Sequence, residues 1–177
     1  MEVTCTIEHD LTDALGEEIR RLQQMAFGAT DEFAAQRWWH TPLSDDEKWF
    51  TVRQDGKLIA SARLLFRIIS TPDGDVLVGG VGNVCSHSDY RGCGAAKACL
   101  RAAAEMIQRE ADFGLLFCGE AVREFYERLG WQVVDNLVRY CYGGEEMTKS
   151  PYTMVHAGRQ AMKDWPAGEI NLNGPDW

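Results

Sequence analysis

The chain has 177 residues, of which 45% are hydrophobic, and it carries a formal net charge of −9. This length and apolar content fit one domain with a real core, and the acidic balance without a basic stripe excludes nucleic acid as a partner. An acidic protein suits a polycationic substrate through electrostatic steering, although simple solubility accounts for the same charge.

Six cysteines stand at positions 5, 85, 93, 99, 118 and 141, and none belongs to a Cys-x-x-Cys pair. Because no signal peptide is visible, we interpret them as reduced thiols of a cytoplasmic protein. The four histidines lack the spacing of zinc ligands, so no metal site is expected. No apolar run is long enough to predict a membrane span.

The first 40 residues predict a strand and two helices. Residues 3–8 alternate as a strand does, and apolar residues then recur at helical spacing over 11–26. Thr12 or Asp10 is the candidate cap of this helix. A second, shorter helical segment is predicted over 30–40.

Three antiparallel strands are predicted next, over 49–53, 58–70 and 76–87. An Asp-Gly dipeptide, which is typical of hairpin turns, joins the first two. The third is apolar and β-branched, as in a buried central strand, and a short turn connects it to a helix over 97–107 with one apolar face.

A fifth strand over 114–118 is expected to run parallel to the central strand, because the helix between them makes a right-handed crossover. A helix over 121–129 follows. Residues 131–134 and 137–142 are predicted to form the last hairpin, and residues 152–156 one more strand.

The turn before the helix at 97–107 reads Arg91-Gly92-Cys93-Gly94-Ala95-Ala96. The first N–H groups of a helix lack intrahelical partners and lie at its positive end, so small residues there favour a bound phosphate. Arg91 adds a forked cation. Neither the P-loop pattern nor the dinucleotide fingerprint is present, and an ordinary strand-turn-helix is the alternative.

This turn resembles the Arg/Gln-x-x-Gly-x-Gly/Ala signature of the GCN5-related N-acetyltransferase (GNAT) superfamily. Phe125-Tyr126-Glu127-Arg128-Leu129-Gly130-Trp131 resembles that superfamily's later Phe-Tyr-x-x-x-Gly-Phe/Trp element. The resemblance covers roughly residues 3–143. It implies a single α/β (α+β) domain over 1–177, with a mixed, mostly antiparallel sheet of six to seven strands, a central parallel pair and about four flanking helices. It also implies acetyl-coenzyme A (acetyl-CoA) as co-substrate, no metal, and the homodimers common in the family.

In that family the turn holds the pyrophosphate, and backbone N–H groups of the central strand hold the pantetheine arm and polarise the thioester carbonyl. The coenzyme-binding residues implied here are Val84, Cys85, Ser86, Arg91, Gly92, Cys93, Gly94, Ala95 and Ala96. Tyr126 lies where the family has its general acid, and packing beside Phe125 on the helix face is the alternative role.

The extension over 145–177 is predicted to fold back over the acceptor site, because an unstructured tail seldom carries two tryptophans. Its Trp-Pro-Ala-Gly-Glu…Asn-Gly-Pro pattern resembles the C-terminus of nodulation N-acyltransferases. The Asp-Trp-x-Ala-Gly-Asp/Glu core and the closing tryptophan resemble aminoglycoside 2′-N-acetyltransferases. In both families the acceptor is an amino sugar.

In the aminoglycoside enzymes a glutamate on the central strand acts as base through water, and the resemblance puts Gly82 at its place. Asn83 beside it is assigned to the catalytic site as a residue that holds a water. The candidate bases are Glu32, Asp31, Glu146 and the terminal carboxylate of Trp177, and an amine that is already neutral needs none.

Position by position, the resemblance implies acceptor contacts at Asp31, Glu32, Glu146, Asp176 and Trp177. Solvated surface charge is the alternative for each carboxylate, and at a helix start the dipole alone favours Asp31 and Glu32. Glu146 is expected in a loop.

The sequence therefore predicts a cytoplasmic acetyl-CoA-dependent N-acetyltransferase that modifies an amine of an aminoglycoside-like amino sugar, as resistance enzymes do. Two alternatives stay open: acetylation of another small amine or a protein N-terminus, and a non-catalytic acyl-CoA sensor. Tyr126 favours the enzyme, whereas glycine at position 82 favours the sensor.

Overall fold

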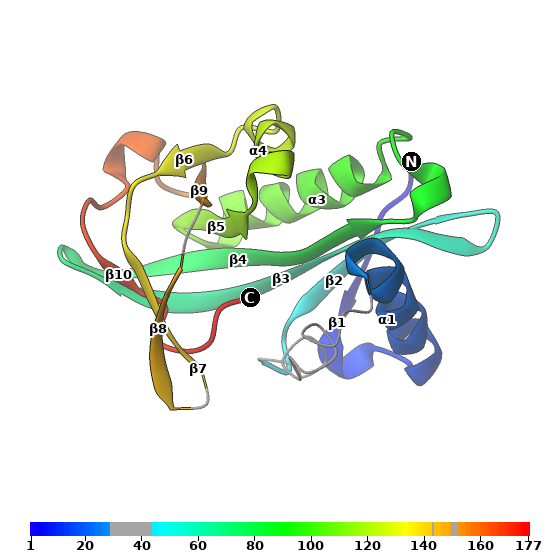
Figure 1. Ribbon diagram of the computed structural model, residues 1–177, viewed down its shortest axis with the longest axis horizontal. Helices are drawn as coiled ribbons and strands as arrows, with labels where there is room; N and C mark the ends of the chain where they lie inside the picture. Colours follow the sequence, from blue (N-terminus) through cyan, green and yellow to red (C-terminus); the bar gives the residue numbers. More distant parts are fainter. Residues whose placement is uncertain (29–43, 143, 150–151) are drawn as a thin grey trace. The chain divides into compact units, whose positions relative to one another are not determined.

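The computed structural model describes residues 1–28, 44–142, 144–149 and 152–177 (Figure 1). The chain divides into two compact units. The first combines Met1–Leu65 with Gly82–Ala103, and the second combines Phe66–Val81 with Ala104–Trp177. Two strands and one helix run from one unit into the other. The second helical segment predicted from the sequence, with Asp31 and Glu32, lies outside the described residues.

The described residues form ten strands, three α-helices and three short 3-10 turns. The strands are β1 (Thr4–Ile7), β2 (Lys48–Gln54), β3 (Lys57–Thr71), β4 (Gly74–Ser86), β5 (Phe113–Cys118), β6 (Gln132–Val134), β7 (Val138–Tyr142), β8 (Glu145–Lys149), β9 (Tyr152–Ala157) and β10 (Ile170–Asn171). The helices and turns are η1 (Glu8–Asp10), α1 (Asp13–Phe27), η3 (Ser88–Tyr90), α3 (Ala95–Glu110), α4 (Glu120–Glu127) and η4 (Met162–Asp164).

In the first unit, α1 begins and ends as the sequence predicts. The Thr12 hydroxyl accepts a hydrogen bond from the N–H of Leu15 at 3.3 Å, so Thr12 rather than Asp10 is the cap. Gly28, with φ 82°, ends the helix. The apolar stripe that contains Ile19 and Leu22 packs against a buried cluster, whose other members are Trp49, Leu58 and Cys85.

The strands of the first unit pair antiparallel in the order β1, β2, β3. The predicted Asp-Gly hairpin is confirmed, because Asp55 and Gly56 both have positive φ, at 50° and 78°. These are the left-handed conformations that a tight hairpin turn requires.

In the second unit the strands follow the order β6-β9-β5-β4-β3-β10-β7-β8 (Figure 1). The predicted parallel pair is confirmed: β4 and β5 pair from Val78↔Phe113 to Val81↔Leu116. Their glycines permit close packing. A Cβ at Gly114 would lie 2.9 Å from the Trp131 ring.

Two details of the predicted sheet are wrong. It has ten strands rather than six to seven, and residues 131–134 do not form a hairpin with 137–142. Instead β6 pairs with β9, and β7 pairs with β8 and β10. The connecting residues resemble a turn in sequence, but the side chain of Asn136 binds the tail. Its amide donates to the carbonyls of Pro166 and Gly168, at 3.0 and 2.7 Å.

The C-terminal tail lies against the sheet of the second unit. The Trp177 indole is 6% exposed and donates to the carbonyl of Leu115 at 3.2 Å. A Cβ at Gly80 would lie 2.3 Å from the Trp177 ring, so only glycine fits under the indole. The guanidinium of Arg67 lies 5.2 Å from the centre of this ring, and Phe117 contacts it as well.

Candidate active site

The junction between β4 and α3, in the first unit, holds most of the predicted coenzyme contacts. Gly92 and Gly94 have φ of 81° and 89°, the left-handed region that favours glycine. A Cβ at either position would meet nothing within 4 Å. The glycines are therefore needed for the path of the backbone, and the space beside the turn is open.

Helix α3 begins directly after this turn. The carbonyl of Gly94 accepts the N–H of Ala98 at 2.9 Å, which makes Gly94 the residue that opens the helix. The N–H groups of Ala95, Ala96 and Lys97 then have no partner within the helix. No acidic residue lies in the first turn of α3, so the positive end of its dipole is uncompensated.

Arg91 and Cys93 are exposed on the same turn. Within the described ranges, the guanidinium of Arg91 has no carboxylate within ion-pair distance. The N–H groups of Arg91 and Cys93 donate to the carbonyls of Ser88 and Tyr90, both at 3.3 Å. The junction thus offers a free cation, the N–H groups at the start of α3 and room, which together fit a diphosphate.

The end of β4 has a local irregularity at Asn83, whose φ is 52°. Pairing of β4 with β5 stops at Val81, two residues earlier, although β4 continues to Ser86. The N–H of His87 donates to the carbonyl of Ile59, on β3, at 2.8 Å. Because successive amides of a strand point to opposite sides, the N–H of Ser86 points away from β3. By the same alternation the N–H of Val84 does so too.

Two side chains on this stretch are buried. The thiol of Cys85 lies 3.2 Å from the Ser61 hydroxyl, and burial raises the pKa of Cys85 to about 11. Cys85 is therefore a neutral core residue and can reach a ligand only through its backbone. Asn83 is 6% exposed, and its side-chain nitrogen has no hydrogen-bond partner.

Tyr126 lies in the second unit, on α4. Its side chain is 8% exposed and its ring meets Phe125 edge-on at 5.2 Å. Its carbonyl accepts the N–H groups of Leu129 and Trp131, at 2.8 and 3.2 Å, and Gly130 has φ 89°. The aromatic-glycine-tryptophan element thus closes α4 and buries Trp131.

Residues 9–134 match the sequence profile of the acetyltransferase (GNAT) domain family. This match spans well over half of the chain and contains both motifs. The chain belongs to the GNAT acetyltransferase family. It is an N-acetyltransferase, and members of this family use acetyl-CoA. No curated protein matches the chain.

Solved structures of other proteins share the fold. An acyl-CoA N-acyltransferase from Pseudomonas aeruginosa aligns with a TM-score of 0.62 at 23% identity, over 88% of this chain and 99% of its own. ElaA from Escherichia coli aligns with a TM-score of 0.62 at 16% identity, over 88% and 98%. The ribosomal-protein-S18-alanine N-acetyltransferase from Escherichia coli gives 0.58 at 18%, over 94% and 100%.

The predicted acceptor residues of this GNAT enzyme have different environments. Glu146 lies in β8, not in the expected loop, and forms an ion pair with Arg139 at 3.0 Å. Asp176 is 4% exposed. Burial, and after it the charge of Asp176, raises the pKa of Tyr140. With the buried Trp177 these residues belong to the second unit, and their contact with an acceptor stays a prediction.

Arg67 is a residue of this region that the sequence analysis missed. It donates to the carbonyl of Pro175 and stacks over Trp177, so it fastens the tail to β3. The signal in the sequence was an arginine within a mostly apolar strand, which also contains Arg63. Nothing in the sequence connected it to a tail more than a hundred positions away.

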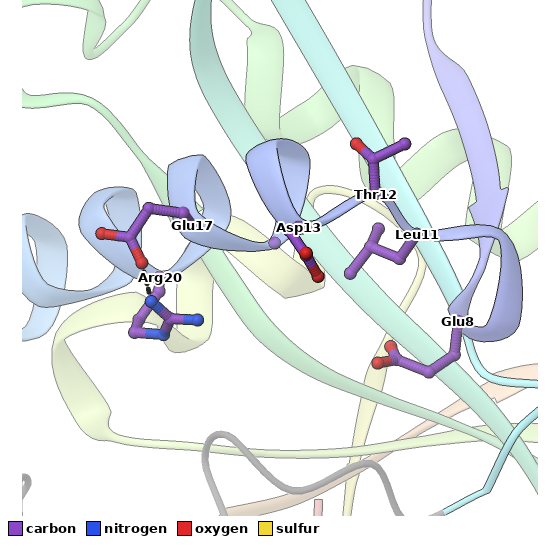
Figure 2. A pocket seen from close by; sticks show the side chains of 7 residues that line it. Glu8, Leu11, Thr12, Asp13, Glu17 and Arg20 are labelled. Carbon is purple, nitrogen blue, oxygen red and sulfur yellow. Dashed lines mark ion pairs between the residues drawn. The ribbon is translucent and has the colours of Figure 1, made fainter.

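An open pocket of about 470 Å³ lies at the start of α1, in the first unit (Figure 2). Its lining includes Glu8, Asp13 and Glu17, and Figure 2 shows Glu17 paired with Arg20. Arg21 binds the same carboxylate. None of the predicted site residues lines this pocket. The ion pairs of Glu17 with Arg20 and Arg21 also offset part of the negative charge of its lining.

The described part of the chain contains no group of three His, Cys, Asp or Glu side chains suited to a metal ion. Within the same part, no helix is long and apolar enough to cross a membrane.

Proposed function

We propose that the chain transfers the acetyl group of acetyl-CoA to a primary amine, with the turn from Arg91 to Ala96 as the pyrophosphate site. The observation that carries the proposal is the pair of left-handed glycines at the uncapped start of α3. The amides of this turn and the free guanidinium of Arg91 suit two adjacent phosphates.

The end of β4 would hold the other half of the coenzyme. The N–H groups of Val84 and Ser86 point away from β3, and they would bind the pantetheine arm and the thioester carbonyl. Donors aimed at that oxygen stabilise the negative charge that develops as the amine attacks. Bound acetyl-CoA supplies the activated acetyl group for this attack.

Tyr126 is the proposed general acid. A phenol, whose ordinary pKa is about 10, keeps its proton at neutral pH and can donate it to the departing thiolate. Glycine at position 82 leaves the central strand without a basic side chain. Deprotonation of the amine would then fall to an acceptor-side carboxylate through water, or to the ordinary equilibrium of the amine.

The proposed acceptor is an amine of an aminoglycoside-like amino sugar. The net charge of −9 and the sequence of the tail support it. A protein N-terminus is the second candidate, because the chain is similar in fold over 94% of its length to the Escherichia coli enzyme named for an alanine of a ribosomal protein.

A thiol-release assay with acetyl-CoA and a panel of amines tests the acceptor. Release with kanamycin, gentamicin or tobramycin supports the amino-sugar acceptor. Release only with peptides that begin with alanine supports the protein N-terminus. Tight binding of acetyl-CoA without release from any amine would overturn the enzymatic role and indicate a sensor.

The exposed thiol of Cys93 allows a direct test of the coenzyme site. Cys5 and Cys141 are the other exposed cysteines, so both are first replaced by serine. If the turn binds the pyrophosphate, acetyl-CoA should slow the reaction of Cys93 with a maleimide, and desulfo-CoA should protect equally. An unchanged rate at saturating coenzyme would exclude the turn.

A further inference from the structure

Strand β8 forms one end of the sheet in the second unit and pairs, among the described residues, with β7 alone. Its residues 145–148 are exposed, including Met147 at 43%. A free strand edge of this kind presents unpaired N–H and C=O groups to any chain that can pair with it. The apolar side chain of Met147, at the centre of the strand, would further stabilise such a pairing if it became buried.

The hydrogen bonds of β7 identify the outward groups of β8. The N–H of Cys141 donates to the carbonyl of Gly174, and the carbonyl of Arg139 accepts the N–H of Leu172. Both groups therefore point away from β8. Glu146 and Thr148 stand opposite these two residues in the register, so their own N–H and C=O groups point away from β7 to the free edge.

The charges of β8 favour one register in which this edge can pair antiparallel with the same strand of a second copy of the chain. A twofold axis at Glu146 would set two glutamates face to face, which is unfavourable. An axis at Thr148 would leave only Met147, Thr148 and Lys149 of each β8 opposite the other copy, which shortens the overlap. An axis at Met147 pairs Glu146 with Thr148 of the other copy and places Glu145 at the register position of Lys149, a residue of opposite charge.

We infer that β8 is a dimerisation edge, which pairs antiparallel with β8 of a second copy across a twofold axis at Met147. The outward groups of Glu146 and Thr148 then make four hydrogen bonds between the chains. Met147 meets its own copy, with Tyr140 beside it on the same face of the sheet. The strand is five residues long, so the interface is small and the dimer depends on protein concentration.

Sedimentation velocity over roughly 10–300 μM protein tests the association, in a range suited to weak affinity. We expect a monomer–dimer equilibrium for the parent chain. Thr148→Pro removes an outward N–H without touching a bond to β7, and it should abolish the dimer. Thr148→Val keeps that N–H and is the matched control, which should dimerise as the parent does.

A cysteine test locates the axis independently of Thr148. With Cys5, Cys93 and Cys141 replaced by serine, Met147→Cys should form a disulfide between chains under mild oxidation. Facing residues of the proposed pair lie about 4.5 Å apart at Cα, within the range that a disulfide spans. Glu145→Cys is the control, because its two copies would lie about 14 Å apart.

We expect Met147→Cys to cross-link at least about tenfold faster than Glu145→Cys, since only its sulfurs can meet. A monomer at all concentrations would overturn the inference. So would a dimer that Thr148→Pro leaves intact, or equal cross-linking of the two cysteine variants.

Discussion

The turn at 91–94 and the tail at 170–177 are held in place in opposite ways. In the turn, Gly92 and Gly94 adopt their conformations with nothing packed around them. In the tail, Asn173 donates to the carbonyl of Ile68 across 105 sequence positions, and Trp177 requires Gly80 beneath it. The turn is thus specified by its own residues and the tail by distant partners. A motif analysis recognises the first kind of feature and misses the contacts of the second.

If this contrast is correct, changes in the turn should alter coenzyme affinity beyond any effect of backbone strain, whereas changes under the tail should alter stability and leave coenzyme affinity unchanged. Tyr126 provides a third class, in which turnover changes and neither affinity nor stability does. Substitutions at five positions follow, from the largest expected effect to the smallest; the first three separate these classes.

Tyr126→Phe should have the largest effect. It removes only the hydroxyl of a buried ring, so packing against Phe125 is kept while the proposed proton donor is lost. We expect kcat to fall by about a hundredfold or more, the usual contribution of a general acid. Calorimetry should show an unchanged affinity for acetyl-CoA. A parental kcat would exclude Tyr126 as the acid.

Gly94→Glu should weaken acetyl-CoA binding on the order of a hundredfold, because it places a carboxylate where the helix start favours an anion. Gly56→Glu is the matched control: Gly56 has a similar φ of 78° and equally open surroundings, in a hairpin turn away from the motif. Both variants strain the backbone alike, and calorimetry should find weaker binding only for Gly94→Glu. Equal affinities would contradict the proposed site.

Gly80→Ala should destabilise the chain by about 2 kcal/mol, because the added methyl group overlaps the Trp177 ring. The measurement is urea unfolding of both single variants and the double variant with Trp177→Ala. Once the indole is gone, the methyl group should cost far less, so the two effects should not add. Additive effects would show that the tail does not depend on this contact.

Two substitutions of Asn83 distinguish a role of its backbone conformation from a role of its side chain. Asparagine tolerates the left-handed conformation, and glycine adopts it freely. If the backbone of Asn83 is what orients the following amides, Asn83→Gly should keep kcat/KM, whereas Asn83→Ala should lower it about tenfold. A loss in both variants would instead assign the function to the side-chain amide, as the water-holding role requires.

Asp112→Asn should have the smallest effect, about 1 kcal/mol of stability. Burial alone would raise the pKa of Asp112, but the hydrogen bond from the N–H of Leu77 and the ion pair with Arg159 hold it below its ordinary value. A depressed pKa means that the carboxylate stabilises the fold at neutral pH and that this stabilisation is lost as the pH falls below about 4.

Urea titrations at a series of pH values from 7 downward check this expectation. The advantage of the parent chain over Asp112→Asn should begin to shrink as the pH falls below about 4, because protonation removes the same charge. An advantage that does not change with pH would show that the charge of Asp112 is not responsible.

The fold was predictable where signals were local and uncertain where partners were distant. The Thr12 cap, the hairpin at Asp55 and Gly56, and the crossover between β4 and β5 each follow from a few adjacent residues or a chirality rule. By contrast, nothing in residues 132–134 says that their partner is β9. The alternation of side chains in a short strand defines its two faces but does not determine which strand it pairs with.

The candidate site divides in the same way. The amides and glycines of the 91–94 turn could be named because backbone chemistry needs no distant partner. The acceptor residues were assigned by position in other families. Two of those that the structure describes are engaged within the protein: Glu146 pairs with Arg139, and Trp177 packs against Gly80 and Arg67. Such engagements depend on which strands become neighbours.

Strand β9 lies between β5 and β6, although it follows both of them in the chain. On a ribosome, β6 is therefore completed 18 residues and β5 34 residues before β9 begins. Until β9 is made, one edge of β5 is unpaired and β6 lacks the strand it pairs with among the described residues, so another polypeptide could bind either. The chain is therefore expected to be open to aggregation late in its synthesis, and a delay before β9 is made would prolong that period.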